Sequence, residues 1–173
     1  IFVSTNRTLS IVGVPVNYDS PSPHSYGTHS SISKDAWVTN AVSSPVDQAN
    51  GARHTCIGWK AEGLGGGAIT NGTNAQAVFQ LTTNIVLTWL WTNQYEALIT
   101  SDVNGSVNNG EKDGWYNEGE VVSDIQATPG GGFSFLQWSG DVPAGQDTNN
   151  PLTVTMNQKR WVTANFVSNV GRT

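Results

Sequence analysis

Short segments in which apolar and polar residues alternate recur along the chain, and turn-forming residues separate them. Asn-Gly pairs and the glycine-rich residues 63–67 and 130–132 supply the turn signals, since Asn-Gly readily takes the positive φ values of tight hairpins. No segment has the periodicity of an amphipathic helix. The predicted strands are residues 8–14, 36–43, 52–59, 75–81, 85–91, 96–103, 120–127, 133–138, 152–156 and 161–167. Ten short strands predict an all-β chain with essentially no helix.

The apolar pattern of the first half of the chain recurs in the second half. Residues 77–91 align without a gap with residues 152–166, so that apolar positions meet apolar positions and each segment reads as a hairpin. Upstream, three further pairs of segments follow in the same order: residues 54–59 with 133–138, 37–45 with 121–129, and 9–11 with 97–99. The order predicts two tandem small β modules, residues 1–93 and 94–173, which meet near residues 92–95.

Large aromatic residues occupy equivalent positions in the two predicted modules. Trp59 aligns with Trp138, and Trp91 aligns with Phe166. Each copy must bury the same face, so these four side chains are predicted to belong to the cores. Seven tryptophans are available to supply core volume in a chain that is only 37% hydrophobic.

The charge and composition of the chain exclude several classes of protein. The formal net charge is −5 and the eight basic residues are scattered, which argues against binding to a nucleic acid backbone. Cys56 is the single cysteine, so an internal disulfide is impossible. No apolar run reaches the roughly 18 residues that a membrane-spanning helix needs, so no membrane span is predicted in this segment.

Searches for catalytic and metal-binding patterns give no site. The chain has no nucleophile elbow, no His-Glu-x-x-His and no phosphate-binding loop, so we expect no enzyme, no catalytic residue and no cofactor-binding residue. His54 and Cys56 face the same side of one strand but supply at most two of the ligands that zinc requires. We therefore predict no metal ligand and place Cys56 in the core.

Side chains with oxygen atoms are concentrated in two segments. Such side chains could bind Ca²⁺, so a calcium site is left open as an alternative. The first group is Asp102, Asn104, Asn108, Asn109, Glu111 and Asp113, and the second is Asp141, Asp147, Asn149 and Asn150. Neither follows a known calcium-binding pattern. Turn geometry, which Asp and Asn favour, is the preferred interpretation of both groups.

Trp115 and Tyr116 form an aromatic pair in a polar segment bounded by glycines, which reads as a turn. An exposed pair of rings there is a candidate ligand-binding site, because aromatic faces stack on sugar rings while polar neighbours bond the hydroxyls. Packing between modules, or at the base of a hairpin, is the favoured alternative.

The second half carries sequence motifs that resemble those of a known family. These are WSGD at residues 138–141, NPLTVTM at 150–156 and TANF at 163–166. With their surroundings, from about residue 96 to 167, they resemble the divergent internalin-type B-repeat. The first half resembles a longer variant, in which Lys60, Ala61 and Glu62 replace the Ser-Gly-Asp after the tryptophan.

This resemblance implies a small β-rich module, β-grasp-like or an immunoglobulin-like sandwich, repeated in tandem on large bacterial surface or secreted proteins. The family has no shared catalytic residues. The expected function is a non-catalytic extracellular segment that acts as a spacer, stalk or adhesive surface. Neighbouring repeat modules of the same or an adjacent chain are the expected partners, with a glycan or a cell-surface protein as further candidates.

Two alternative functions follow from other features. The long loops predicted at residues 15–33 and 62–74, together with exposed aromatics, would suit a module that binds carbohydrate or protein. The apolar start Ile1-Phe2-Val3 would suit a strand-donating subunit of an extracellular filament. Phe2-Val3-Ser4 recurs as Phe166-Val167-Ser168, and the chain begins without Met, so we expect it to be part of a longer array.

Overall fold

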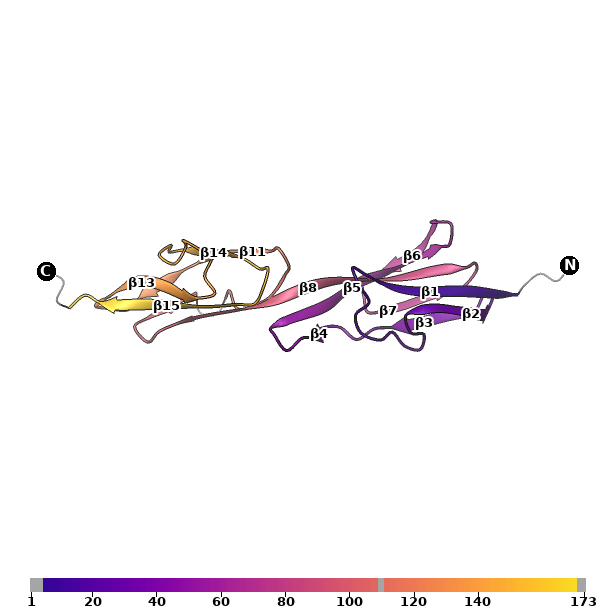
Figure 1. The fold of residues 1–173 in the computed structure, drawn as a ribbon, viewed down its shortest axis with the longest axis horizontal. Coiled ribbons are helices and arrows are strands. Elements are labelled where there is room, and N and C mark those ends of the chain that lie inside the picture. The colour runs from indigo at the N-terminus through magenta and orange to yellow at the C-terminus, as the bar shows by residue number, and fades with distance from the viewer. Residues whose placement is uncertain (1–4, 109–110, 171–173) are drawn as a thin grey trace. The chain divides into compact units, whose positions relative to one another are not determined.

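The computed structural model describes residues 5–108 and 111–170, which contain fifteen strands and no helix (Figure 1). The all-β prediction is confirmed. No helix of the described part has the length and hydropathy to cross a bilayer. Residue contacts divide the chain into two compact units. Unit 1 comprises residues 1–47 and 53–92, and unit 2 comprises residues 48–52 and 93–173.

Unit 1 is built from a large sheet and a separate two-stranded sheet. Its strands are β1 (Asn6–Val14), β2 (Gly27–Ser33), β3 (Trp37–Ala41), β4 (Val46–Asp47), β5 (Ala52–Gly63), β6 (Ala68–Gly72), β7 (Gln76–Gln80) and the first part of β8 (Ile85–Ser101). In the large sheet β1 lies between β2 and β8, and β5 pairs with β4, β6 and β8. The pair β3–β7 makes the smaller sheet, and its inward side chains share one apolar core with those of β1, β5 and β8.

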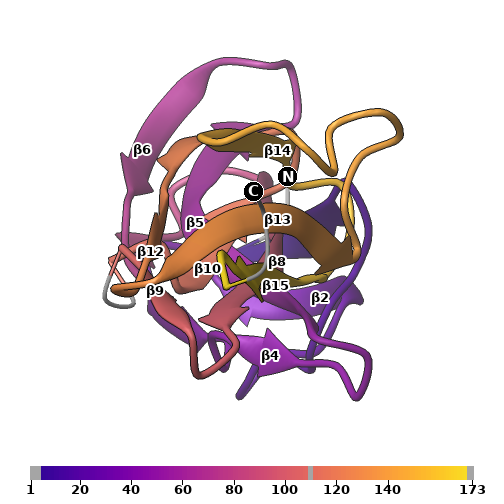
Figure 2. The same cartoon turned by 90° about the vertical axis from the view of Figure 1, so that its left-hand side faces the viewer.

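Unit 2 has a similar arrangement, with two separate strand pairs in place of one. Its strands are the end of β8, β9 (Gly105–Val107), β10 (Gly114–Asn117), β11 (Val121–Ile125), β12 (Ala127–Pro129), β13 (Phe133–Gly140), β14 (Leu152–Thr155) and β15 (Arg160–Ser168). The large sheet has the order β10-β8-β15-β13, and β11–β14 and β12–β9 are separate pairs. Figure 2 shows β13, β14 and β15 of unit 2. Buried side chains of these strands, among them Trp138, Val154 and Val162, belong to the second core.

The internal repeat extends to the pairing of individual strands. In unit 1, β1 runs parallel to β8 with Leu9 opposite Ile85. In unit 2, β8 runs parallel to β15 with Ala97 opposite Arg160. The sequence alignment makes Leu9 equivalent to Ala97 and Ile85 equivalent to Arg160. Both copies therefore join their first and last strands in the same parallel register, and both form a two-layer sandwich without a helix.

One predicted strand break is wrong. Residues 85–91 and 96–103 are predicted as two separate strands, one in each module, but β8 continues from Ile85 to Ser101. Gln94 and Tyr95 lie opposite residues of β10 and remain extended. The intervening residues contain no Gly or Pro, so nothing in this segment forces the chain to turn.

Segments predicted as loops or turns contain further strands, which include β4 and most of β12. The expected loop at residues 15–33 includes β2, which carries His29, and the loop at residues 62–74 includes β6. Trp115 and Tyr116 lie on β10 rather than in a turn, and β9 precedes it. These strands are short or lie mostly exposed at sheet edges, so they do not show the apolar alternation on which the prediction depended.

A short segment of the first half of the sequence belongs to unit 2. Gly51, within residues 48–52, accepts a hydrogen bond at its carbonyl oxygen from the Glu96 amide, 3.0 Å away. Gly51 has a φ of 72°, and the Lys159 side chain occupies the space where a Cβ would lie. Lys159 in turn places its Nζ 3.0 Å from Glu96 Oε2. Ile1-Phe2-Val3, Asn109 and the repeated Phe2-Val3-Ser4 lie outside the described residues.

Candidate functional site

The four aromatic residues predicted for the cores are all buried. Trp59 and Trp91 pack in the core of unit 1, and Trp138 and Phe166 pack in the core of unit 2. The two equivalent tryptophans also use their indole N–H groups alike. Trp59 Nε1 donates to Asn74 Oδ1 at 3.3 Å, and Trp138 Nε1 donates to the Asn149 carbonyl oxygen at 2.7 Å. Each ring therefore fills its core and fixes the segment that leads into β7 or β14.

The WSGD motif at residues 138–141 lies at the end of β13 and forms hydrogen bonds with β15. After Trp138, the Ser139 hydroxyl accepts a hydrogen bond from Asn165 Nδ2 at 2.9 Å. Gly140 has a φ of 92°, and a Cβ at this position would overlap the Trp161 carbonyl oxygen. Asp141 bonds the Trp161 backbone twice: its amide donates to the Trp161 carbonyl at 2.9 Å, and its Oδ2 accepts from the Trp161 amide at 3.1 Å. Every residue of the motif thus has a structural partner.

Arg160, which precedes Trp161 on β15, is 9% exposed and bonds neutral groups. Its guanidinium donates to the Asp141 carbonyl at 3.1 Å, to Asn157 Oδ1 at 2.6 Å and twice to the Thr155 carbonyl. These bonds close the turn between β14 and β15 and attach it to the end of β13. A buried arginine in this setting stabilises the fold, since its donors are already used by the protein.

The carboxylates and amides considered as calcium ligands mostly bond the backbone. Asp113 Oδ1 accepts from the Ile99 amide at 2.7 Å, and Asn108 Oδ1 accepts from the Gln126 amide. Asn150 bonds both backbone groups of Ala127, at 2.9 and 2.8 Å. Among the described residues, no group of three or more His, Cys, Asp or Glu side chains lies close enough to hold a metal ion. The side chains of these two segments therefore stabilise the local backbone through hydrogen bonds.

Asp102, which follows the end of β8, accepts two hydrogen bonds from backbone amides. Its Oδ2 accepts from the Phe166 amide at 2.9 Å and its Oδ1 accepts from the Asn104 amide at 2.8 Å. These bonds, the one from Phe166 first, hold the pKa of the Asp102 carboxyl below its ordinary value of 3.8.

Acid is therefore expected to weaken unit 2 through Asp102. A depressed folded-state pKa contributes stability that is present above the unfolded pKa of 3.8 and is lost as the pH falls through the folded value. Urea unfolding of the wild-type chain and of Asp102→Asn, followed from pH 7 to about pH 2, should show a shallower acid dependence in the variant. Asp147→Asn is the control, because the Asp147 carboxylate accepts no hydrogen bond from the described residues; equal pH dependence in Asp102→Asn and wild type would contradict the assignment.

The aromatic pair on β10 is only partly accessible. Tyr116 packs against the core of unit 2, and its hydroxyl donates to the Lys112 carbonyl at 2.9 Å. Burial raises the pKa of the Tyr116 phenol. The Trp115 side chain is half-buried. A ligand-binding role for the pair stays a prediction.

His54 and Cys56 have different partners in unit 1. The His54 ring stacks on Tyr18 with centroids 3.6 Å apart and planes 12° from parallel. The Cys56 thiol packs against the core and lies 3.4 Å from the Gly58 carbonyl oxygen. Burial raises the pKa of the Cys56 thiol, so it stays protonated near neutral pH. The two side chains therefore serve packing.

One family model matches the second half of the chain. Residues 95–170, from the end of β8 to β15 and with the whole of the WSGD motif, match the model of the divergent InlB B-repeat domain. Unit 2 is similar to this domain and takes from it the label B-repeat domain. No curated protein and no solved structure matches the chain.

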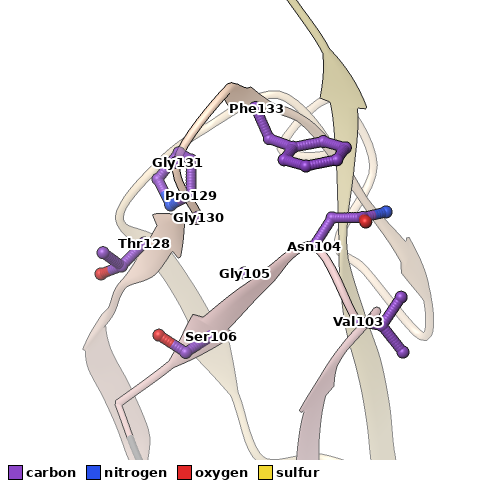
Figure 3. A pocket seen from close by; sticks show the side chains of 9 residues that line it. All are labelled: Val103, Asn104, Gly105, Ser106, Thr128, Pro129, Gly130, Gly131 and Phe133. Carbon is purple, nitrogen blue, oxygen red and sulfur yellow. The ribbon is translucent and has the colours of Figure 1, made fainter.

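A shallow pocket of about 420 Å³ lies in the B-repeat domain at the ends of β9 and β12. Figure 3 shows the Phe133 ring above the Asn104 side chain, while Val103 is directed away from both. The opposite wall is the backbone of Gly130 and Gly131 with Pro129. The lining has no charged side chain, histidine or cysteine, so it offers no acid or base that would activate the hydroxyls of Ser106 and Thr128.

Sequence reasoning missed the tryptophan that is most exposed. Trp37, at the start of β3, is 71% exposed, and Trp161, on β15 of the B-repeat domain, is 56% exposed. Trp37 borders a groove of about 310 Å³ in unit 1. The alignment of the two halves carried a usable signal, because Trp37 is equivalent to Val121 and so is not a ring that both cores require.

Proposed function

We propose that the chain is a non-catalytic spacer segment of a bacterial surface protein. The B-repeat match suggests an extracellular repeat domain of this class of protein. The observation that carries the spacer role is the repeated parallel pairing, Leu9 with Ile85 and Ala97 with Arg160, which closes each sandwich between its first and last strands. Strands joined side by side along their length load many hydrogen bonds together when the chain ends are pulled.

The chemistry of the described residues also supports a structural role. The polar side chains of the WSGD motif, Arg160 and Asp102 bond backbone groups of their own unit. A catalytic site would instead leave an acid, a base or a nucleophile facing a substrate cavity. The two units have separate apolar cores, as repeat modules that stand in series need.

Pulling on the whole chain from its two ends tests this proposal. We expect two separate unfolding events in single-molecule force spectroscopy, one for each compact unit. Each event should lengthen the chain by roughly 25–30 nm, because each unit holds on the order of 85 residues and an extended residue spans up to ~3.6 Å.

The variant Trp138→Ala supplies the matched control, since its side chain lies in the core of unit 2 alone. It should weaken or abolish one of the two events and leave the other at its original force. Gradual lengthening of the wild-type chain without force peaks would contradict the spacer role.

A further inference from the structure

Trp37 stands on the outer face of the two-stranded sheet of unit 1. Side chains alternate along β3, so Val38 and Asn40 are buried while Trp37 and Thr39 face outward. Val78, opposite Thr39 on β7, also faces outward and is exposed. The indole is fixed to a hydrogen-bonded strand at a position where no core packing requires it.

A groove with apolar and polar walls runs beside this ring. Its lining consists of Trp37, Ile69, Thr70, Val78, Phe79, Gln80 and Thr82. Gln80 lies directly opposite Trp37 in the sheet, and its Nε2 donates to the Asp35 carbonyl at 2.9 Å, which fixes the orientation of the amide. The hydroxyls of Thr70 and Thr82 make no hydrogen bond with other described residues, so they remain available to a ligand.

The groove carries no charge. No lining residue is ionisable, in a chain whose formal net charge is −5. The adjacent turn holds Lys34 and Asp35, whose charged groups lie 3.8 Å apart and offset each other. The Arg7 guanidinium lies at the rim of the groove, where its Nε donates to the Thr82 carbonyl oxygen at 3.3 Å. The lining itself offers no cation to an acidic ligand and no carboxylate to a cationic one, and the net charge of the protein disfavours an acidic ligand further. The charge pattern therefore fits a neutral occupant.

We propose that the Trp37 groove binds a neutral β-linked glycan, a function beyond that of a spacer. The flat C–H face of a pyranose ring covers the indole, which removes apolar surface of both from water. Thr70, Thr82 and the Gln80 amide bond the ring hydroxyls along the rim of the groove. A β-1,4-linked glucan suits this arrangement, because its rings present flat faces with equatorial hydroxyls at their edges.

The B-repeat domain provides an internal comparison. Val121 occupies the position equivalent to Trp37, at the start of β11, and is itself 58% exposed. Both units thus have an exposed apolar side chain at this position, but the side chain is aromatic only in unit 1. The substitution Trp37→Val places in unit 1 the residue that unit 2 already carries.

Calorimetric titration of the whole chain with cellohexaose tests the proposal. We expect weak binding by the wild type, with a Kd on the order of 0.1–1 mM, and at least a tenfold loss in Trp37→Val. Trp161→Val is the matched control, because it removes the other highly exposed tryptophan, in unit 2. It should bind like the wild type. If Trp37→Val melts at a lower temperature than the wild type, Gln80→Ala serves as a second groove variant. Gln80 is exposed, so the substitution should reduce the affinity for cellohexaose without unfolding the sheet.

Several results would overturn the proposal. One is the absence of heat with cellohexaose, and another is equal binding by the wild type and Trp37→Val. Equal or tighter binding of an acidic probe, oligogalacturonate, would contradict the neutral occupant. Self-association of the wild type in sedimentation, abolished by Trp37→Val, would identify a second copy as the occupant instead. None of these outcomes depends on the force measurement, so the glycan site and the spacer role fail separately.

Discussion

Replacing Gly140 with alanine is expected to destabilise the B-repeat domain by about 2–5 kcal/mol. The φ of 92° disfavours any residue with a Cβ, at about 1–2 kcal/mol. The added methyl would also overlap the Trp161 carbonyl oxygen, which belongs to the strand that pairs with β13 and accepts the Asp141 amide. Relief of that overlap requires the two strands to separate locally, which adds a further cost of roughly 1–3 kcal/mol.

Urea unfolding followed by far-ultraviolet circular dichroism measures this loss. Gly131→Ala is the control, because the space around that residue is open and its φ is not in the left-handed region. It should unfold within about 1 kcal/mol of the wild type. Similar midpoints for Gly140→Ala and Gly131→Ala would show that the WSGD turn is not constrained as described.

Trp138→Ala is the second substitution with a large expected effect, a loss of about 3–5 kcal/mol. The Trp138 side chain is 1% exposed and contacts the Phe135 ring, with centroids 5.5 Å apart. Its removal leaves a cavity and deprives the Asn149 carbonyl of the indole N–H. A loss of this size is a large share of the stability of a small domain.

Trp161→Ala tests whether burial, rather than the residue type, causes that loss. Trp161 is 56% exposed, so its truncation should change the free energy of unfolding by less than about 1 kcal/mol. Thermal unfolding by calorimetry would resolve the difference. Equal destabilisation by the two substitutions would contradict the assignment of Trp138 to the core.

The cores were predictable from sequence because two copies of one pattern constrain each other. Phe79 and Val154 align, as do Leu81 and Met156, and all four side chains are buried. Alternation along a strand assigns a face, and repetition shows which face is needed in both copies. Arg160 was not predicted as a buried residue, because its partners are carbonyl oxygens of a turn that the alternation does not describe.

Edge strands and exposed rings were the features that sequence did not reveal. β2 and β10 pair within their sheets but bury little apolar surface, so they show no hydrophobic periodicity. Trp37 follows Ala36 and Trp115 follows Gly114, so their sequence neighbours give no sign of burial, yet Trp37 is largely exposed and Trp115 is half-buried. The difference arises from the neighbouring strands, which are distant in sequence.

The placement of residues 48–52 in unit 2 has a consequence for the evolution of such arrays. The Gly51 carbonyl oxygen accepts a hydrogen bond from the Glu96 amide, and the Lys159 side chain packs against Gly51. A complete second module therefore includes five residues that lie within the first module in the sequence. A recombination event that moved residues 94–173 behind an unrelated module would leave this pentapeptide behind. Modules of this kind would be inherited most readily in adjacent pairs, and their order along an array would be under selection.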